Sequence, residues 1–162
     1  MNKGRMSEVL SLEYRMLLES LGQFEKALTR NSVISLQDIV RVFEEQLLLH
    51  RRREEEALFP VMARHLPGPG GPVAQRSSRS REHGERLKEL RVNILMGHRG
   101  KYLFQGQLFV TRLRDHLRGA NDFLLPLAER LLSAREWEQV RKNLDSIGSR
   151  SEPVVPEAVV SA

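Results

Sequence analysis

Histidine and glutamate side chains recur at positions of this sequence that a helix would turn inward. In the segment "LLLHRRREEEALFP", residues 47–60, His50 and Glu54 are four residues apart. On an α-helix this spacing places both side chains on one face, one turn apart. Leu47 and Leu58 continue the same face. The pattern therefore predicts a buried imidazole and a buried carboxylate that point to one spot.

Three further polar side chains, Tyr14, His83 and His116, occupy equivalent positions in other apolar stripes. Burying such groups without partners costs a few kcal/mol each. A metal ion such as iron, manganese or zinc would satisfy imidazole and carboxylate together, and so would a mutual hydrogen-bond network. A single His-x-x-x-Glu is usually a surface pair. Inward histidines on three helices, one with the carboxylate of Glu54, favour a metal site.

Four amphipathic helices must position these side chains, because apolar residues recur at spacings of three and four while strand signals are scarce. Their apolar stripes predict helices over about 6–29, from Ser35 through Val61, over about 75–97 and over about 101–132. Short connections make an up-down-up-down four-helix bundle, an all-α fold. Ser133 and Glu136 are predicted to cap a short fifth helix that ends near Ile147.

Two segments of the chain repeat each other. "HRRREEEALFP" (50–60) and "HLRGANDFLLP" (116–126) both begin with His, carry Leu eight residues later and end with Pro. The second segment has Ala120 where the first has its glutamate. Pro60 and Pro126 each remove a backbone hydrogen bond, so both helices are predicted to bend there.

Composition limits the alternatives. The 162 residues predict one domain, a bundle over 1–148 followed by a disordered tail over 149–162. The absence of cysteine excludes disulfides and thiolate chemistry. No apolar run has membrane-spanning length and no signal-peptide pattern is present, so a cytoplasmic location is predicted. The basic segment "RSSRSRE", 76–82, has no aromatic residues for base stacking. It is interpreted as a loop or frayed helix start, and nucleic-acid binding is not expected.

The sequence also resembles the bacterial hemerythrin-like (HHE cation-binding) domain family. That family has an early "EH", a His-x-x-x-Glu followed by "LFP", a second "EH" and a second His-x-x-x-Glu followed by "LFP". The matching segments are "EYRMLLESL" at 13–21, "HRRREEEALFP" at 50–60, "REHGERLKEL" at 81–90, "HLRGANDFLLP" at 116–126 and "LLSAREWEQV" at 131–140. The resemblance implies a site for two non-heme irons between the four helices, with His50, His83 and His116 as ligands and Glu54 as a bridging carboxylate.

Two positions depart from the family pattern. Tyr14 replaces the first histidine and Ala120 replaces the second bridging glutamate. Asn121, one residue later, offers only a neutral amide oxygen, and Asp122 is turned away from the stripe. Three outcomes remain open: a di-iron centre with Tyr14 as a phenolate ligand, a single metal held mainly by His50 and Glu54, or no metal.

Three hypotheses of function follow from the resemblance. The first is a non-heme iron protein that binds or senses oxygen, nitric oxide or peroxide, or handles iron. The second is a metal-free bundle that acts as a protein-interaction module. The third, an iron enzyme that consumes peroxide or oxygen, ranks last because no organic substrate pocket is identifiable. The expected partners are a metal ion and a small diatomic ligand or peroxide. A homodimer is a further possibility, and binding to a membrane is not expected.

Overall fold

The computed structural model of the chain describes residues 3–30 and 33–149, and the regular elements in these ranges are helices. They are α1 (Lys3–Thr29), α2 (Val33–Arg53), η1 (Glu54–Leu58), α3 (Phe59–Met62), α4 (Pro72–Leu95), α5 (Arg99–Gly119), η2 (Ala120–Leu124), α6 (Leu125–Leu131) and α7 (Ala134–Ser149). The second helix begins two residues before the predicted cap at Ser35. Of the predicted tail, 150–162 lie outside the described residues.

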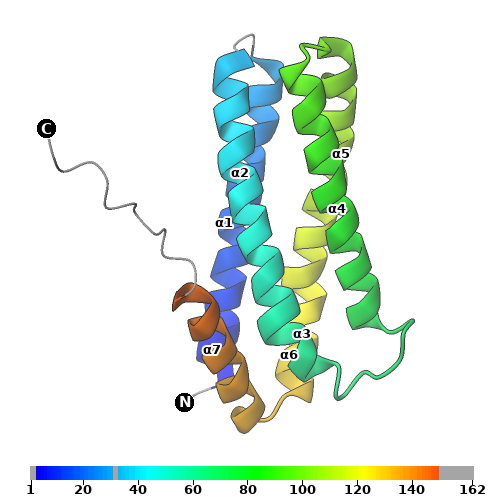
Figure 1. The fold of residues 1–162 in the computed structure, drawn as a ribbon. Helices are drawn as coiled ribbons and strands as arrows, with labels where there is room; N and C mark the ends of the chain where they lie inside the picture. Colours follow the sequence, from blue (N-terminus) through cyan, green and yellow to red (C-terminus); the bar gives the residue numbers. More distant parts are fainter. Residues whose placement is uncertain (1–2, 31–32, 150–162) are drawn as a thin grey trace, which may run out of the picture.

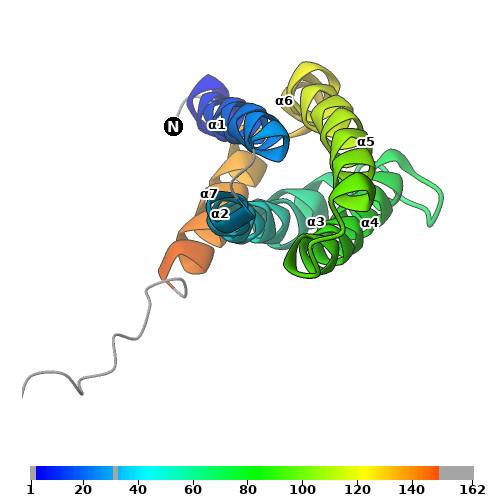
Figure 2. The ribbon, with the colours of Figure 1, turned by 90° about the horizontal axis from the view of Figure 1, so that it is seen from above.

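Four long rods form an up-down-up-down bundle, as predicted (Figure 1). The first rod is α1, the second joins α2, η1 and α3, the third is α4, and the fourth joins α5, η2 and α6. Seen along its axis, the bundle places α1, α2, α4 and α5 in a ring, so each rod contacts the rod before and after it (Figure 2). The fold class is therefore all-α, a four-helix bundle with an additional short helix.

An aromatic layer of three phenylalanine rings lies in the bundle interior. Phe24 of α1 stacks on Phe43 of α2, with 5.6 Å between ring centroids, and Phe109 of α5 meets both rings edge-on. All three side chains are buried. Offset-stacked and edge-to-face arrangements are the favourable geometries for aromatic pairs. On its other side Phe109 faces His83 at 6.5 Å, so this layer borders the polar part of the interior.

Each proline of the repeat follows a π-helical turn. The turns η1 and η2 begin at Glu54 and at Ala120, the two equivalent positions of the repeat. The backbone N–H of Phe59 donates to the carbonyl of Glu54, and that of Leu125 donates to the carbonyl of Ala120, each five residues earlier. Pro60 and Pro126 then lie near the start of the next α-helix. The predicted disturbance thus takes the form of a wide turn, a feature that concentrates at functional sites.

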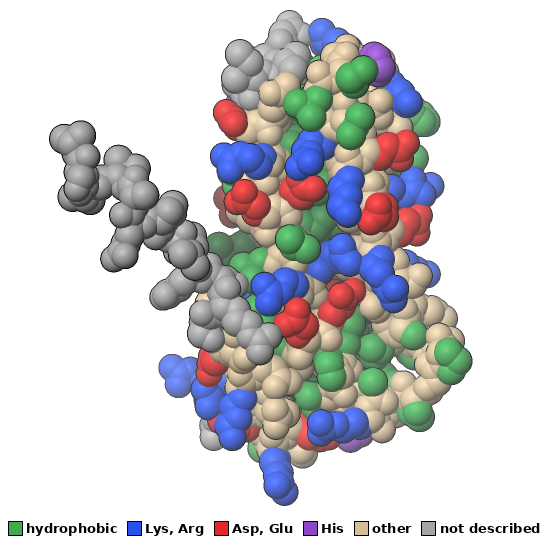
Figure 3. Space-filling model, viewed as in Figure 1, with side chains coloured by type: hydrophobic (Ala, Val, Ile, Leu, Met, Phe, Trp, Pro, Cys, Tyr) green, Lys and Arg blue, Asp and Glu red, His purple; other side chains and the backbone are tan. Residues whose placement is uncertain are grey.

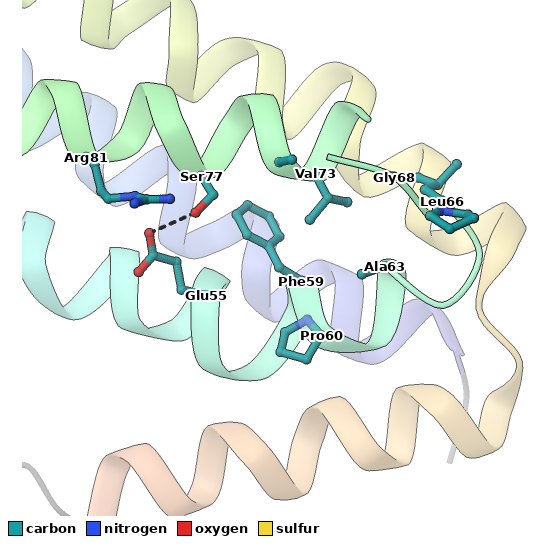
Figure 4. Close-up of a pocket in the computed structure, with 11 residues that line it drawn as sticks. Glu55, Phe59, Pro60, Ala63, Leu66, Gly68, Val73, Ser77 and Arg81 are labelled. Carbon is teal, nitrogen blue, oxygen red and sulfur yellow. Dashed lines mark hydrogen bonds between the residues drawn. The ribbon is translucent and has the colours of Figure 1, made fainter. Parts of the chain in front are cut away.

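The connection to α4 corrects one prediction. The helix begins at Pro72, at a position where proline's fixed φ suits the first turn. The basic segment 76–82 therefore lies inside α4, not in a loop or a frayed helix start. The connection also closes one end of a hollow of ≈ 520 Å³ between α3 and α4, with Phe59 and Val73 inside and Ser77 donating to Glu55 at 3.2 Å (Figure 4).

The fifth helix expected from the sequence is α7, and it is capped as predicted. The Ser133 N–H donates to the Glu136 carboxylate at 2.8 Å, and the Glu136 N–H donates to the Ser133 hydroxyl at 3.3 Å. Trp137 is buried against the bundle. Asn143 donates to the carbonyl of Ala57 in η1 at 3.4 Å. The α7 helix therefore packs on the π-helical turn that begins at Glu54.

Charged side chains of both signs alternate on the outside of the bundle (Figure 3). The "RRREEE" run contributes partly exposed ion pairs, Arg51 with Glu55 at 3.8 Å and Arg52 with Glu56 at 3.1 Å. Such pairs contribute little to stability. Among the described helices, none combines the length and apolar character needed to cross a membrane.

Candidate metal centre

The first half of the polar interior joins α1 to α2 and η1. The Tyr14 hydroxyl donates a short hydrogen bond to Oε1 of Glu54, and both side chains are buried. His50 packs edge-on against the Tyr14 ring, with 4.8 Å between centroids. Its Nε2 lies 3.4 Å from Glu54 Oε1, an ion-pair distance without hydrogen-bond geometry. The structure thus brings three of the five predicted ligands into contact.

Sequence reasoning missed Glu13 as a member of this cluster. Its carboxylate lies 3.3 Å from Nδ1 of His50 and accepts a 2.6 Å hydrogen bond from Arg53. The signal was the "EY" pair, where the acid directly precedes the inward tyrosine. His50 consequently lies between two carboxylates, one on each ring nitrogen.

Charge complementarity controls the protonation of this half. Burial opposes the charged form of His50, but the contact with Glu13 and the negative charges of Glu54 and Glu13 outweigh it and raise the pKa of His50 to about 9. Burial also opposes ionisation of Glu54, yet contacts with His50 and Tyr14 lower its pKa to about 2. Burial and the Glu54 charge raise the pKa of Tyr14 well above its ordinary value. A charged imidazole, an ionised carboxylate and a neutral phenol therefore coexist here.

The second half consists of His83 on α4 and His116 on α5. Their rings meet edge-on with 5.0 Å between centroids, and both side chains are buried. Burial lowers the pKa of His83 to about 4, and burial together with the Arg76 charge lowers that of His116 to about 3. Arg76 also donates to the His116 carbonyl at 3.0 Å. Both imidazoles are therefore neutral at pH 7, the form that binds metals.

The second repeat provides no carboxylate to this interior. Ala120 is fully buried and packs in the apolar core. The side-chain amide oxygen Oδ1 of Asn121 accepts a 2.7 Å hydrogen bond from the hydroxyl of Ser11 in α1, so this amide is already engaged. Asp122 is exposed, as the helical spacing predicted. The other two histidines, His65 and His98, are exposed and lie near helix ends.

Unpartnered buried atoms test whether these residues suit a metal. His50 Nε2, Glu54 Oε2 and His83 Nδ1 are buried without hydrogen-bond partners. Imidazole nitrogen and carboxylate oxygen are the donors that iron, manganese and zinc accept. Within 3–30 and 33–149, no group of three or more His, Asp or Glu side chains is arranged to hold a metal ion as it stands. The donor chemistry fits a metal, while the side chains bond to one another.

Comparison with known proteins decides the family. The model of the hemerythrin HHE cation-binding domain matches residues 5–128, more than half of the chain. The chain belongs to the hemerythrin HHE cation-binding domain family. No curated protein and no protein of solved structure matches the sequence significantly. This hemerythrin-family domain includes both halves of the polar interior and both π-helical turns within the matched range, whereas α7 lies beyond it. Metal-cation binding is thus the property that the family supports.

Proposed function

We propose that this hemerythrin-like protein binds non-heme iron between its four long helices, to bind or sense oxygen, nitric oxide or peroxide, or to handle iron. The observation that carries the proposal is the pair of buried clusters. Glu54 with His50, and His83 with His116, place unpartnered nitrogen and oxygen atoms in the interior of a family fold that is described as cation-binding. Such atoms are costly to bury unless something binds them.

Each residue has a role in this proposal. His50, His83 and His116 provide imidazole ligands, and Glu54 provides the carboxylate. Tyr14, whose hydroxyl donates a hydrogen bond to Glu54, provides a phenolate when the iron is ferric, because a bound cation lowers the pKa of a coordinating group. When bound, a non-heme iron with so few protein ligands provides open coordination positions to a small molecule.

Protons must leave the first half before iron binds there. His50 is charged at pH 7, and the Tyr14 hydroxyl bonds to Glu54. A metal ligand has to be deprotonated, so binding releases protons and its affinity rises with pH. Glu13 stays paired with Arg53 and holds the other ring nitrogen of His50, which fixes the ring orientation.

Elemental analysis with an optical spectrum of protein from iron-supplied cells tests this proposal. About two irons per chain would support a dinuclear centre, and about one would support a single site at His50 and Glu54. The variants His50→Ala and Glu54→Ala should lose the iron, whereas Glu56→Ala, on the exposed side of the same turn, should keep it. An iron-free protein after anaerobic loading with ferrous iron would overturn the proposal.

A metal-free interaction module is the second candidate, and one observation favours it. Tyr14, Glu54, His50 and Glu13 already satisfy much of one another's hydrogen bonding without a metal. In that case chelators would leave thermal stability unchanged, and His116→Leu would be tolerated. A rise in melting temperature on adding ferrous iron would exclude this alternative, because a ligand that binds only the folded state stabilises it.

A further inference from the structure

Arginines gather around a pocket that opens between α4 and α5, beside the second half of the polar interior. Arg76, Arg79 and Arg86 line it from α4 and Arg112 from α5, with His83 and His116 also in its lining. Two of these arginines, Arg76 and Arg79, lie in the basic segment 76–82, for which the sequence analysis gave no role. The pocket, called the arginine pocket below, has a volume of ≈ 530 Å³, which is typical of small-molecule sites.

The charges of the arginine pocket do not cancel. Its four arginines face two carboxylates, those of Glu82 and Asp115. Glu82 is already engaged by Arg86 at 2.6 Å. Arg79 and Arg112 form no ion pair within the described part of the chain, and their side chains are exposed. Four positive and two negative charges leave an excess of two positive charges around one cavity.

Arg76 adds a second, independent observation. One terminal nitrogen donates to the His116 carbonyl at 3.0 Å, which holds the guanidinium in place. Its Nε atom is buried and has no hydrogen-bond partner. Arg76 and Arg79 lie three residues apart on α4, a spacing at which like charges on a helix repel each other. An anion bound in the pocket would offset that repulsion.

We propose that the arginine pocket binds a phosphate group, carried by inorganic phosphate or by a small phosphate monoester. Guanidinium groups match phosphate oxygens with paired, charge-assisted hydrogen bonds. A nucleic-acid strand fits less well, because the lining has no Phe, Tyr or Trp on which a base could stack. The cavity is larger than one phosphate, which leaves room for the rest of a small monoester.

The arginines of this site are not proposed metal ligands, and His50 and Glu54 are not part of its lining, but His83 and His116 border both sites. Phosphate binding is therefore measured on chelator-treated protein, in which no iron is present to bind the phosphate. The His50→Ala protein, which should lose iron, should therefore bind phosphate as the parent protein does. Loss of iron without loss of phosphate binding separates the two proposals.

Titration calorimetry of the full chain at constant ionic strength is the test, with inorganic phosphate and glycerol 3-phosphate as probes. Saturable binding should weaken by about tenfold or more in Arg79→Gln/Arg112→Gln, since two charge-assisted contacts are removed. Arg118→Gln, on α5 outside the pocket, should change affinity less than about twofold. The affinity of Arg79→Lys/Arg112→Lys should lie between that of the parent protein and that of Arg79→Gln/Arg112→Gln. Lysine keeps the positive charge but lacks the planar guanidinium that forms paired hydrogen bonds with phosphate.

The two probes identify the source of the phosphate. Tighter binding of glycerol 3-phosphate indicates a monoester, and equal or tighter binding of inorganic phosphate indicates the free ion. Both altered arginines are exposed, so unchanged helical circular dichroism is expected and should be checked. Absence of saturable binding of either probe, or equal affinity in the Gln/Gln variant and the parent, would overturn the proposal.

Discussion

The two repeat segments share their backbone and differ in their chemistry. Both place a buried histidine one turn before a π-helical turn and a proline shortly after it. In the first, the turn begins with the ionised Glu54, which Tyr14 and His50 contact. In the second, it begins with Ala120, which packs in the apolar core. The turn is therefore a property of the shared backbone pattern, independent of the carboxylate that one copy carries.

The difference also separates the protonation states. The first segment holds its histidine charged between two carboxylates, whereas the second holds its histidine neutral beside another imidazole and Arg76. Glu54 and Glu13 on one side, and Ala120 and Arg76 on the other, thus divide one polar interior into a charged half and a neutral half. The predictions below test this division, beginning with the largest expected effect.

Exchanging the residues that begin the two turns should have the largest effect. Glu54→Ala leaves a buried charged imidazole without one of its partners, and should cost the metal-free protein about 3–5 kcal/mol of unfolding free energy. Ala120→Glu buries a new carboxylate and should also destabilise the metal-free protein. Added ferrous iron should recover that loss and raise the iron content per chain. Urea unfolding with and without iron measures both effects. If iron does not stabilise the Ala120→Glu protein, then a carboxylate at position 120 does not reach the proposed metal.

The pH dependence of metal-free stability should reveal both halves. The pKa of His50 is raised in the folded state, so its contribution is complete below about pH 6.5 and is lost as the pH rises through about 9. That loss amounts to about 3 kcal/mol. The pKa values of His83 and His116 are lowered to about 4 and about 3, so these residues destabilise the fold as the pH falls below about 6.5.

Denaturant unfolding of chelator-treated protein from pH 4 to 10 measures these two limbs. His50→Gln should flatten the alkaline limb alone, and His83→Gln should flatten part of the acid limb alone. Identical pH profiles for the two variants would show that the polar interior is not divided in this way.

Tyr14→Phe should have a smaller effect. The variant keeps the ring that packs on His50 and loses the hydrogen bond to an ionised carboxylate, a loss of about 2 kcal/mol. Thermal unfolding measures this loss, with Tyr102→Phe on α5 as the matched control. In iron-loaded protein the same variant should lose any visible phenolate band. A band that persists would remove Tyr14 from the ligand set.

Ser11→Ala should have the smallest effect, and it concerns the second segment. The variant removes the 2.7 Å hydrogen bond to Asn121, worth about 1 kcal/mol at a partly buried position. Calorimetric unfolding should detect it, with the exposed Ser78→Ala as the reference. We expect the iron content per chain to stay unchanged in this variant, because the freed amide oxygen of Asn121 is a weak neutral ligand. A rise in iron content would instead show that Asn121 can bind the metal.

Apolar periodicity was sufficient to predict the bundle and the burial of its polar residues. His50, Glu54, His83 and His116 follow the same helical stripe as the leucines, so the pattern itself predicts that they face inward. Glu13 was missed because its contact with His50 depends on how α1 and α2 pack together, which a single helix pattern does not specify.

Local hydrogen bonding explains the other differences. The π-helical turns were predicted only as bends at proline, because a sequence indicates that a bond is lost but not which bond replaces it. The basic segment was interpreted as a loop or frayed helix start, whereas Pro72 begins the helix four residues earlier. The order and spacing of the motifs predicted the resemblance to the hemerythrin family, which the family model then confirmed. The proposed metal ligands remain a prediction, because Tyr14 and Ala120 differ from the family pattern at two of the expected ligand positions.

The aromatic layer also has a consequence for access to the polar interior. Phe24, Phe43 and Phe109 close the interior on one side of the histidines with rings that are almost completely buried. Water and ions do not readily cross such an apolar partition. We therefore expect traffic to the polar interior to enter from the side opposite the layer or between α4 and α5. The latter route passes the arginines, so permeation there should favour anions over cations.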